Sequence, residues 1–160
     1  MSNAATAQIL PSSLQGVPGL KMRSVNIALA LATLALPVAV ASSFGITTSV
    51  GLSNVLVAGS FAYLLPAAFA ATLIVPAVDA ARPWTRVVDI AAAALACGFL
   101  AFVAYAIISA IGQINDAQRA FGSMIGGYPR QSFASIFPGI GAIPIAILAL
   151  MSSWKAWRGR

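Results

Sequence analysis

The chain has 160 residues, of which 60% are hydrophobic and only 8% are charged, and its formal net charge is +6. A soluble domain carries about 25% charged residues, so this composition excludes an ordinary water-soluble globule and favours a membrane protein. The sequence contains no histidine and no glutamate, which excludes bis-histidine haem ligation and most transition-metal sites. Its one cysteine, Cys97, excludes an intrachain disulfide.

The chain begins with a segment that is predicted to form an irregular cytoplasmic arm, residues 1–24, in which Pro11 and Pro18 interrupt any long helix. Four apolar runs follow, each close to the length that crosses about 30 Å of hydrocarbon as a helix. The sequence therefore predicts an all-α polytopic membrane protein. Its transmembrane domain is 25–160, and the predicted spans are about 25–43, 54–78, 87–111 and 136–154.

The basic residues lie beside these spans and mostly on one side of them. Seven Lys and Arg side chains fall on the side of the N-terminus and two on the other side, so the positive-inside rule predicts that both termini are cytoplasmic. We expect a bacterial inner (plasma) membrane, and no nucleic-acid partner, because the charges flank spans instead of forming a soluble basic face. The seven are Lys21, Arg23, Arg82, Arg86, Lys155, Arg158 and Arg160, and the other two are Arg119 and Arg130.

The first predicted span has a second interpretation. The segment Val38-Ala39-Val40-Ala41-Ser42 follows a basic and then an apolar stretch, as a signal-peptidase site does. Cleavage there would remove a 42-residue N-terminal region and leave three spans. The long arm that precedes Lys21 and Arg23 favours the uncleaved chain with four spans.

The segment between the third and fourth spans, 112–135, is the longest predicted outer loop. Apolar residues recur in it at helical spacing, with Asp116 and Arg119 off that stripe. This pattern is typical of a helix lying in the membrane interface. It is equally compatible with a third span that continues as a helix beyond the membrane. The stripe consists of Ile114, Ala117, Phe121, Met124 and Ile125.

Two pairs of similar segments indicate a tandem duplication of one helical hairpin. Residues 23–30 and 86–93 share Arg, Val, Ile and two Ala in register, and the alignment places Asn26 opposite Asp89. Likewise 60–66 and 132–138 share Ser-Phe-Ala followed by Pro. Chance similarity between Ala-rich spans is the alternative. If the repeat holds, its two halves are parallel, with a pseudo-two-fold axis along the membrane normal.

Asn26 and Asp89 are then candidates for a paired polar site near the cytoplasmic boundary. The simpler interpretation is local, because Asp89 lies within one helical turn of Arg86 and can form an ion pair or a cap there.

Small residues and prolines supply further candidate positions within the spans. Small residues four positions apart allow helix backbones to approach closely, and prolines kink helices. Kinked helices form substrate sites in transporters, although proline is also simply frequent in membrane helices. The packing candidates are Ala94, Gly98, Ala142 and Ala146, and the kink candidates are Pro37, Pro66 and Pro144.

No spacing ties a nucleophile, a base and an orienting group together, so we expect neither an enzyme nor a cofactor or metal site. No charged residue lies deep in a span, which argues against an ion or proton pump. The sequence therefore favours a non-catalytic small membrane subunit that packs in, or helps to assemble, a larger membrane complex. Its partners would be the lipid bilayer and other membrane subunits or further copies of itself. The alternatives are a small oligomeric channel or transporter for a neutral or weakly polar solute and, less favoured, a lipid-binding protein.

Overall fold

The computed structural model describes residues 19–43, 46–55, 59–125 and 134–158. Most of these residues are helical, as predicted, but the chain is not all-α, because a small antiparallel sheet is also present. The helices are α1 Leu20–Ala35, α2 Leu52–Val55, α3 Leu64–Ala77, α4 Thr85–Ile125 and α5 Ala142–Arg158, with 3-10 turns η2 Gly59–Tyr63 and η3 Asp79–Trp84. The strands are β1 Pro37–Ser43, β2 Ile46–Gly51 and β3 Ala134–Pro138, in the order β2-β1-β3.

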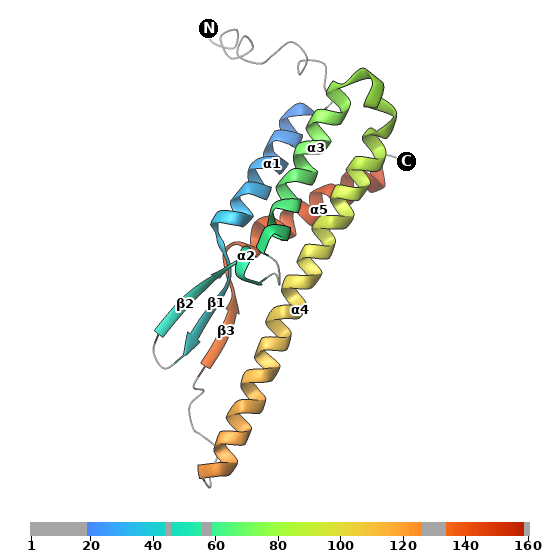
Figure 1. Ribbon diagram of the computed structural model, residues 1–160. Coiled ribbons are helices and arrows are strands. Elements are labelled where there is room, and N and C mark those ends of the chain that lie inside the picture. Colours follow the sequence, from blue (N-terminus) through green and yellow to red (C-terminus); the bar gives the residue numbers. More distant parts are fainter. Residues whose placement is uncertain (1–18, 44–45, 56–58, 126–133, 159–160) are drawn as a thin grey trace.

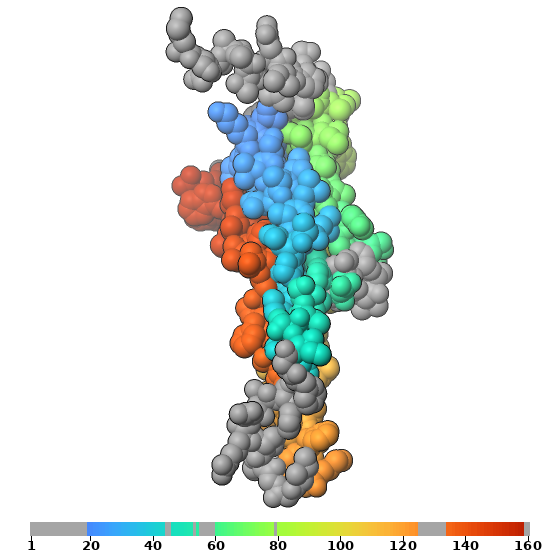
Figure 2. All heavy atoms as spheres, turned by 90° about the vertical axis from the view of Figure 1, so that its left-hand side faces the viewer, coloured from blue at the N-terminus to red at the C-terminus, as the bar shows by residue number. Residues whose placement is uncertain are grey.

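Four of the helices form a bundle, and the sheet lies beyond one of its ends. Helix α1 packs against α3 and α5, and α4 packs against the same two helices. The sheet extends from the end of α1 alongside the second half of α4, with β3 nearest that helix and β2 farthest from it (Figure 1). The molecule is therefore elongated along α4, as the view from the side also shows (Figure 2).

Two helical stretches are long and apolar enough to cross a membrane, Ser60–Ala77 and Ala80–Met124. Helix α4 has 41 residues and is therefore about 61 Å long, roughly twice the thickness of a hydrocarbon core. Helices α1 and α5 have 16 and 17 residues, which makes each about 25 Å long. The prediction that all four cross a membrane stays a prediction.

The bundle interior is filled by apolar side chains from all four helices. Ala30 of α1, Leu65 of α3, Ala96 of α4 and Leu148 of α5 are fully buried in one cluster. In water, burial of apolar surface contributes about 25 cal/mol per Å² to the stability of a protein. Between helices in lipid, the close packing of such side chains stabilises mainly through van der Waals contact. The described core between the helices is thus mainly apolar, with the small polar side chains of Asn26, Thr33, Thr72 and Ser152 also buried.

The predicted first and fourth spans are each shorter as helices than the sequence suggested. The helix over 25–43 ends at Ala35, and Pro37–Ser43 is strand β1. Pro37 lacks a backbone N–H and forces the preceding residue, Leu36, into an extended conformation with ψ of 142°. At the other end, the predicted span over 136–154 begins as strand β3, and helix α5 starts only at Ala142.

Strand β1 is the central strand of the sheet. It pairs antiparallel with β2 on one side and with β3 on the other, for example at Val40, which lies opposite Ser49 and Phe137. The signal-peptidase-like segment 38–42 lies within β1. Cleavage there would therefore divide the strand that holds the other two together.

The turn between β3 and α5 crosses the junction between α1 and β1 at very short range. The N–H groups of Gly139 and Gly141 donate to the carbonyls of Val38 and Pro37, both at 2.8 Å. A Cβ atom on Gly141 would lie 2.6 Å from the Leu36 carbonyl oxygen, and one on Gly139 would lie even closer to that of Pro37. Only glycine allows this backbone approach.

The second half of α4 contains the apolar stripe of the predicted outer loop, and whether this part lies in a membrane interface stays a prediction. Helix α4 continues without interruption to Ile125, so the third predicted span extends as a helix beyond its apolar core. Of the predicted stripe, Phe121 and Met124 are exposed and Ile114 is half-buried against the sheet. Gly126-Gly127-Tyr128-Pro129, which follows, lies outside the described residues.

The three prolines predicted as kinks lie at the ends of helices and not in their middle. Pro37 follows α1, while Pro66 and Pro144 are each the third residue of their helix, α3 and α5. The first turn of a helix has no intrahelical acceptor for its N–H groups, so proline is tolerated there without a kink. These positions mark helix boundaries instead of bending a helix.

Two pairs of segments suggested a duplication. The segments of the first pair have the same secondary structure, whereas those of the second pair differ. Residues 23–30 and 86–93 both lie near the start of a helix, α1 and α4. Ser60-Phe61-Ala62 lies in the 3-10 turn η2, whereas Ala134 and Pro138 lie in strand β3, and 132–133 are outside the described residues. The hairpin repeat stays a prediction.

Candidate functional site

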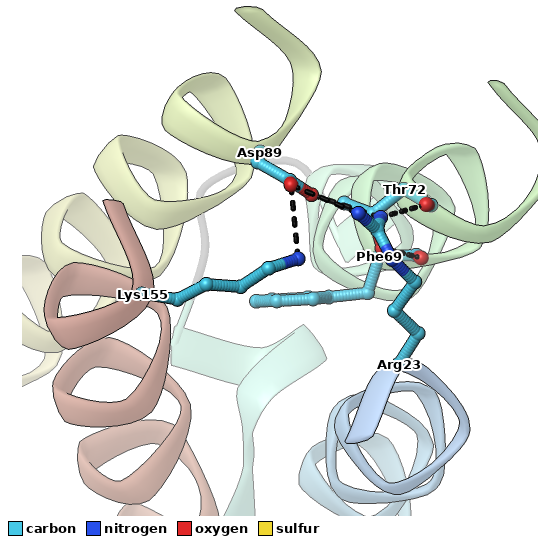
Figure 3. A network of polar contacts seen from close by, with 5 residues as sticks. All are labelled: Arg23, Phe69, Thr72, Asp89 and Lys155. Atoms are coloured by element: carbon cyan, nitrogen blue, oxygen red, sulfur yellow. Dashed lines mark hydrogen bonds and ion pairs between the residues drawn. The ribbon is translucent and has the colours of Figure 1, made fainter. Parts of the chain in front are cut away.

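Three charged side chains from three helices meet at the end of the bundle where α1 and α4 begin and α5 ends. The Asp89 carboxylate of α4 accepts hydrogen bonds from Arg23 Nη1 and Nη2 at 2.9 and 3.0 Å and from Lys155 Nζ at 2.9 Å. Figure 3 shows the carboxylate between the two cations. We call Arg23, Asp89 and Lys155 the charge cluster.

The charge cluster also engages the fourth helix. Arg23 Nη1 donates to the backbone carbonyl of Thr72 on α3, and the Phe69 side chain of α3 extends into the space between Arg23 and Lys155 (Figure 3). Arg23, Asp89 and Lys155 are 4%, 18% and 35% exposed. Paired, hydrogen-bonded charges in such a place stabilise the arrangement only as a set, because any one left alone would be buried without a partner.

The charge cluster shows which side chains Asp89 binds. The local pairing of Asp89 with Arg86 is wrong: the partners of Asp89 are Arg23 and Lys155, each 66 residues away along the chain. The residue aligned with it, Asn26, is buried on α1, and its Oδ1 has no hydrogen-bond partner among the described residues. The hydrogen bonds that Asp89 accepts among the described residues come from Arg23 and Lys155, and none of them comes from Asn26.

The last turn of α5 continues the basic surface beside the cluster. The Arg158 guanidinium lies 4.4 Å from the centre of the Trp154 ring, and Trp154 and Trp157 have ring centroids 5.9 Å apart. Both tryptophans are more than half exposed. Exposed indoles next to cations are typical of the headgroup level of a membrane.

An apolar groove of about 640 Å³ lies along α4 and beside the start of α3. Small residues of α4 line it, and Phe61 of η2 and Leu64 of α3 line it from another part of the chain. The small lining residues are Ala91, Ala94 and Gly98. A Cβ atom on Gly98 would meet nothing within 4 Å. Two predicted packing positions, Ala94 and Gly98, therefore face this groove and not another helix of the same chain.

The other predicted packing positions lie within the bundle. Ala142 and Ala146 of α5 are half-buried, on the helix that packs against α1 and α4. Cys97 of α4 is exposed, with its Sγ 3.4 Å from Ser153 Oγ of α5. Ala142 and Ala146 are thus partly covered within the chain, whereas Ala94 and Gly98 of α4 are exposed.

A smaller pocket of about 230 Å³ lies between the second half of α4 and strand β3. Ile114 and Gln118 line it from α4, and Ser135 lines it from β3. Gln118 Nε2 donates to the Ala134 carbonyl at 3.4 Å. This contact positions the sheet against α4.

Sequence reasoning missed the charge cluster and the glycine pair at the strand–helix turn. The only signals were the isolated Asp89 near a span start and the Gly139-Ile140-Gly141 spacing after Pro138. Among the residues that the structure describes, no three His, Cys, Asp or Glu side chains come together as a metal site would require. No protein-family model, curated protein or solved structure matches the chain.

Proposed function

We propose that this chain is a small non-catalytic subunit of a larger membrane complex, which binds a transmembrane helix of another subunit in the groove on α3 and α4. The four bundle helices cross the membrane, and both termini are cytoplasmic. The charge cluster then lies at the cytoplasmic boundary, and the sheet and the second half of α4 lie on the opposite side.

The groove is the observation that carries this proposal. The residues of α4 that line it extend from Ala91 to Phe102, about 16 Å or three helical turns. Small residues along such a groove let a second helix approach closely enough for backbone and side-chain contact. The lining is apolar throughout, which suits a transmembrane helix better than a polar solute.

The mainly apolar core between the four helices favours this function over transport. A carrier or channel for a weakly polar solute would need a polar passage near the axis of the bundle. Most of the described side chains buried between the helices are apolar, Leu65, Phe69 and Leu148 among them. The hydroxyls of Thr33, Thr72 and Ser152 are also buried, but each donates to a carbonyl of its own helix. Among the described residues, Asn26 is the remaining buried polar side chain away from the charge cluster. The three prolines at helix ends likewise provide no broken helix in mid-membrane.

The test is to purify the tagged full chain from its native membrane in mild detergent and to weigh the intact complexes by mass spectrometry. A stoichiometric partner subunit is expected with the native chain. Gly98→Ile places a bulky side chain in the groove at a position where an added Cβ atom meets nothing within 4 Å, and it should weaken retention of the partner about tenfold, equivalent to 1.4 kcal/mol.

The matched control is Ala104→Ile, which adds a similar side chain at an exposed position of α4 outside the groove lining. It should leave retention unchanged. A native chain that runs as a solitary monomer, with lipid alone in the groove, would contradict the proposal. Equal effects of the two substitutions would show that the groove is not the contact.

A further inference from the structure

We propose that Lys155 and Arg158 bind the phosphate of an anionic phospholipid at the cytoplasmic end of α5. This inference rests on the membrane orientation given under the proposed function, but not on the partner subunit. It assigns a ligand to a surface that the packing of the chain leaves with surplus positive charge.

The charge cluster contains more positive than negative side chains. Arg23 approaches both oxygens of Asp89 with its two terminal nitrogens, which is the geometry of a complete guanidinium–carboxylate pair. Lys155 then adds a second cation to the same single carboxylate. Within the charge cluster, two positive charges face one negative charge, and an additional anion beside the partly exposed Lys155 would be stabilising.

Lys155 retains hydrogen-bond donors that no described residue uses. An ammonium group has three donors, and among the described residues Lys155 Nζ uses one of them, toward Asp89. Lys155 is about one-third exposed, whereas Arg23 is almost completely buried. The surplus charge is therefore presented to the outside by Lys155.

Lys155 lies beside a second cation and an exposed indole on α5. Arg158 lies three residues further along the helix, so the two side chains project from neighbouring turns. Arg158 rests on the exposed ring of Trp154. Indoles in membrane proteins lie at the headgroup level, so the two cations are at the height of lipid phosphates. Basic clusters of this kind on the cytoplasmic side recognise anionic headgroups.

The test measures thermal unfolding of the purified full chain in a neutral detergent while one lipid is added. Phosphatidylglycerol should raise the unfolding midpoint by about 4–8 °C near saturation, and phosphatidylcholine should not. Lys155→Gln should abolish this difference between the two lipids, and Lys155→Arg should restore it. Because each variant is compared with itself in the two lipids, a general loss of stability does not affect the result.

Arg119→Gln is the matched control, since it removes the same charge from an exposed position at the other end of α4. It should keep the full response to phosphatidylglycerol. Equal midpoints in the two lipids, or an undiminished response in Lys155→Gln, would overturn the proposal. An equal, saturable response to inorganic phosphate would overturn the assignment to a lipid. Failure to find a partner subunit in the native membrane, with the response to phosphatidylglycerol intact, would contradict only the proposed function.

Discussion

The carboxylate of Asp89 on α4 accepts two hydrogen bonds from Arg23 on α1, at 2.9 and 3.0 Å, across 66 residues of sequence. Lys155 of α5 donates to the same carboxylate, and Arg23 also donates to the Thr72 carbonyl of α3. The charge cluster therefore connects all four bundle helices.

Substituting this carboxylate is expected to destabilise the bundle strongly. Asp89→Asn keeps the size of the side chain but removes the negative charge that Arg23 and Lys155 share, so the free energy of unfolding should fall by about 3–5 kcal/mol. Asp116→Asn is the control, because Asp116 is 79% exposed and its ion pair with Arg119 is long, at 4.0 Å. It should change stability by less than about 0.5 kcal/mol. Denaturant titration in micelles measures both, and similar losses would contradict the structural role of the cluster.

The close backbone approach at the strand–helix turn predicts a sharp difference between glycines. Gly141→Ala places a methyl group 2.6 Å from the Leu36 carbonyl oxygen and should cost about 1–3 kcal/mol of stability. Gly98→Ala meets nothing within 4 Å and should be neutral or stabilise helix α4 by about 0.5–1 kcal/mol. Thermal unfolding in detergent compares the two variants. A destabilised Gly98→Ala with an unaffected Gly141→Ala would show that the turn is not packed in this way.

Asn26 offers a substitution that should improve stability. Its side chain is buried on α1 and its Oδ1 has no hydrogen-bond partner among the described residues. A buried unsatisfied polar atom costs about 1–3 kcal/mol, so Asn26→Leu, which has a similar volume, should stabilise the protein by about 1 kcal/mol. Asn115→Leu, at an exposed position of α4, should have little effect. A large loss of stability in Asn26→Leu would mean that the amide has a necessary partner in the membrane.

The orientation can be tested with single cysteines in a Cys97→Ser background. Lys21 and Thr48 are both exposed, at the start of α1 and in strand β2. In sealed vesicles of known orientation, a membrane-impermeant maleimide should label Thr48→Cys only from the non-cytoplasmic side. Lys21→Cys should be labelled only from the cytoplasmic side. Labelling of both positions from one side would exclude four crossings with cytoplasmic termini.

The sequence predicted the features of this protein that depend on interactions between residues close together along the chain. Composition and apolar runs act locally, because a helix satisfies its own backbone hydrogen bonds. The sequence therefore determined that this chain is mostly helical and contains stretches that can cross a membrane. The start of α4 near Thr85 and the apolar stretch that follows it likewise depend on neighbouring residues alone.

Only the tertiary structure decided what those helices do at their ends. Pro37–Ser43 is as apolar as a helical span, but it becomes a strand because β2 and β3 pair with both of its edges. Asp89 has a cation one turn away in Arg86, yet it binds Arg23 and Lys155, which only the folded bundle brings within 3 Å. Gly98 and Ala146 are equivalent as small residues in sequence, whereas packing leaves one open and half-buries the other. Each difference arises from contacts between residues far apart along the chain.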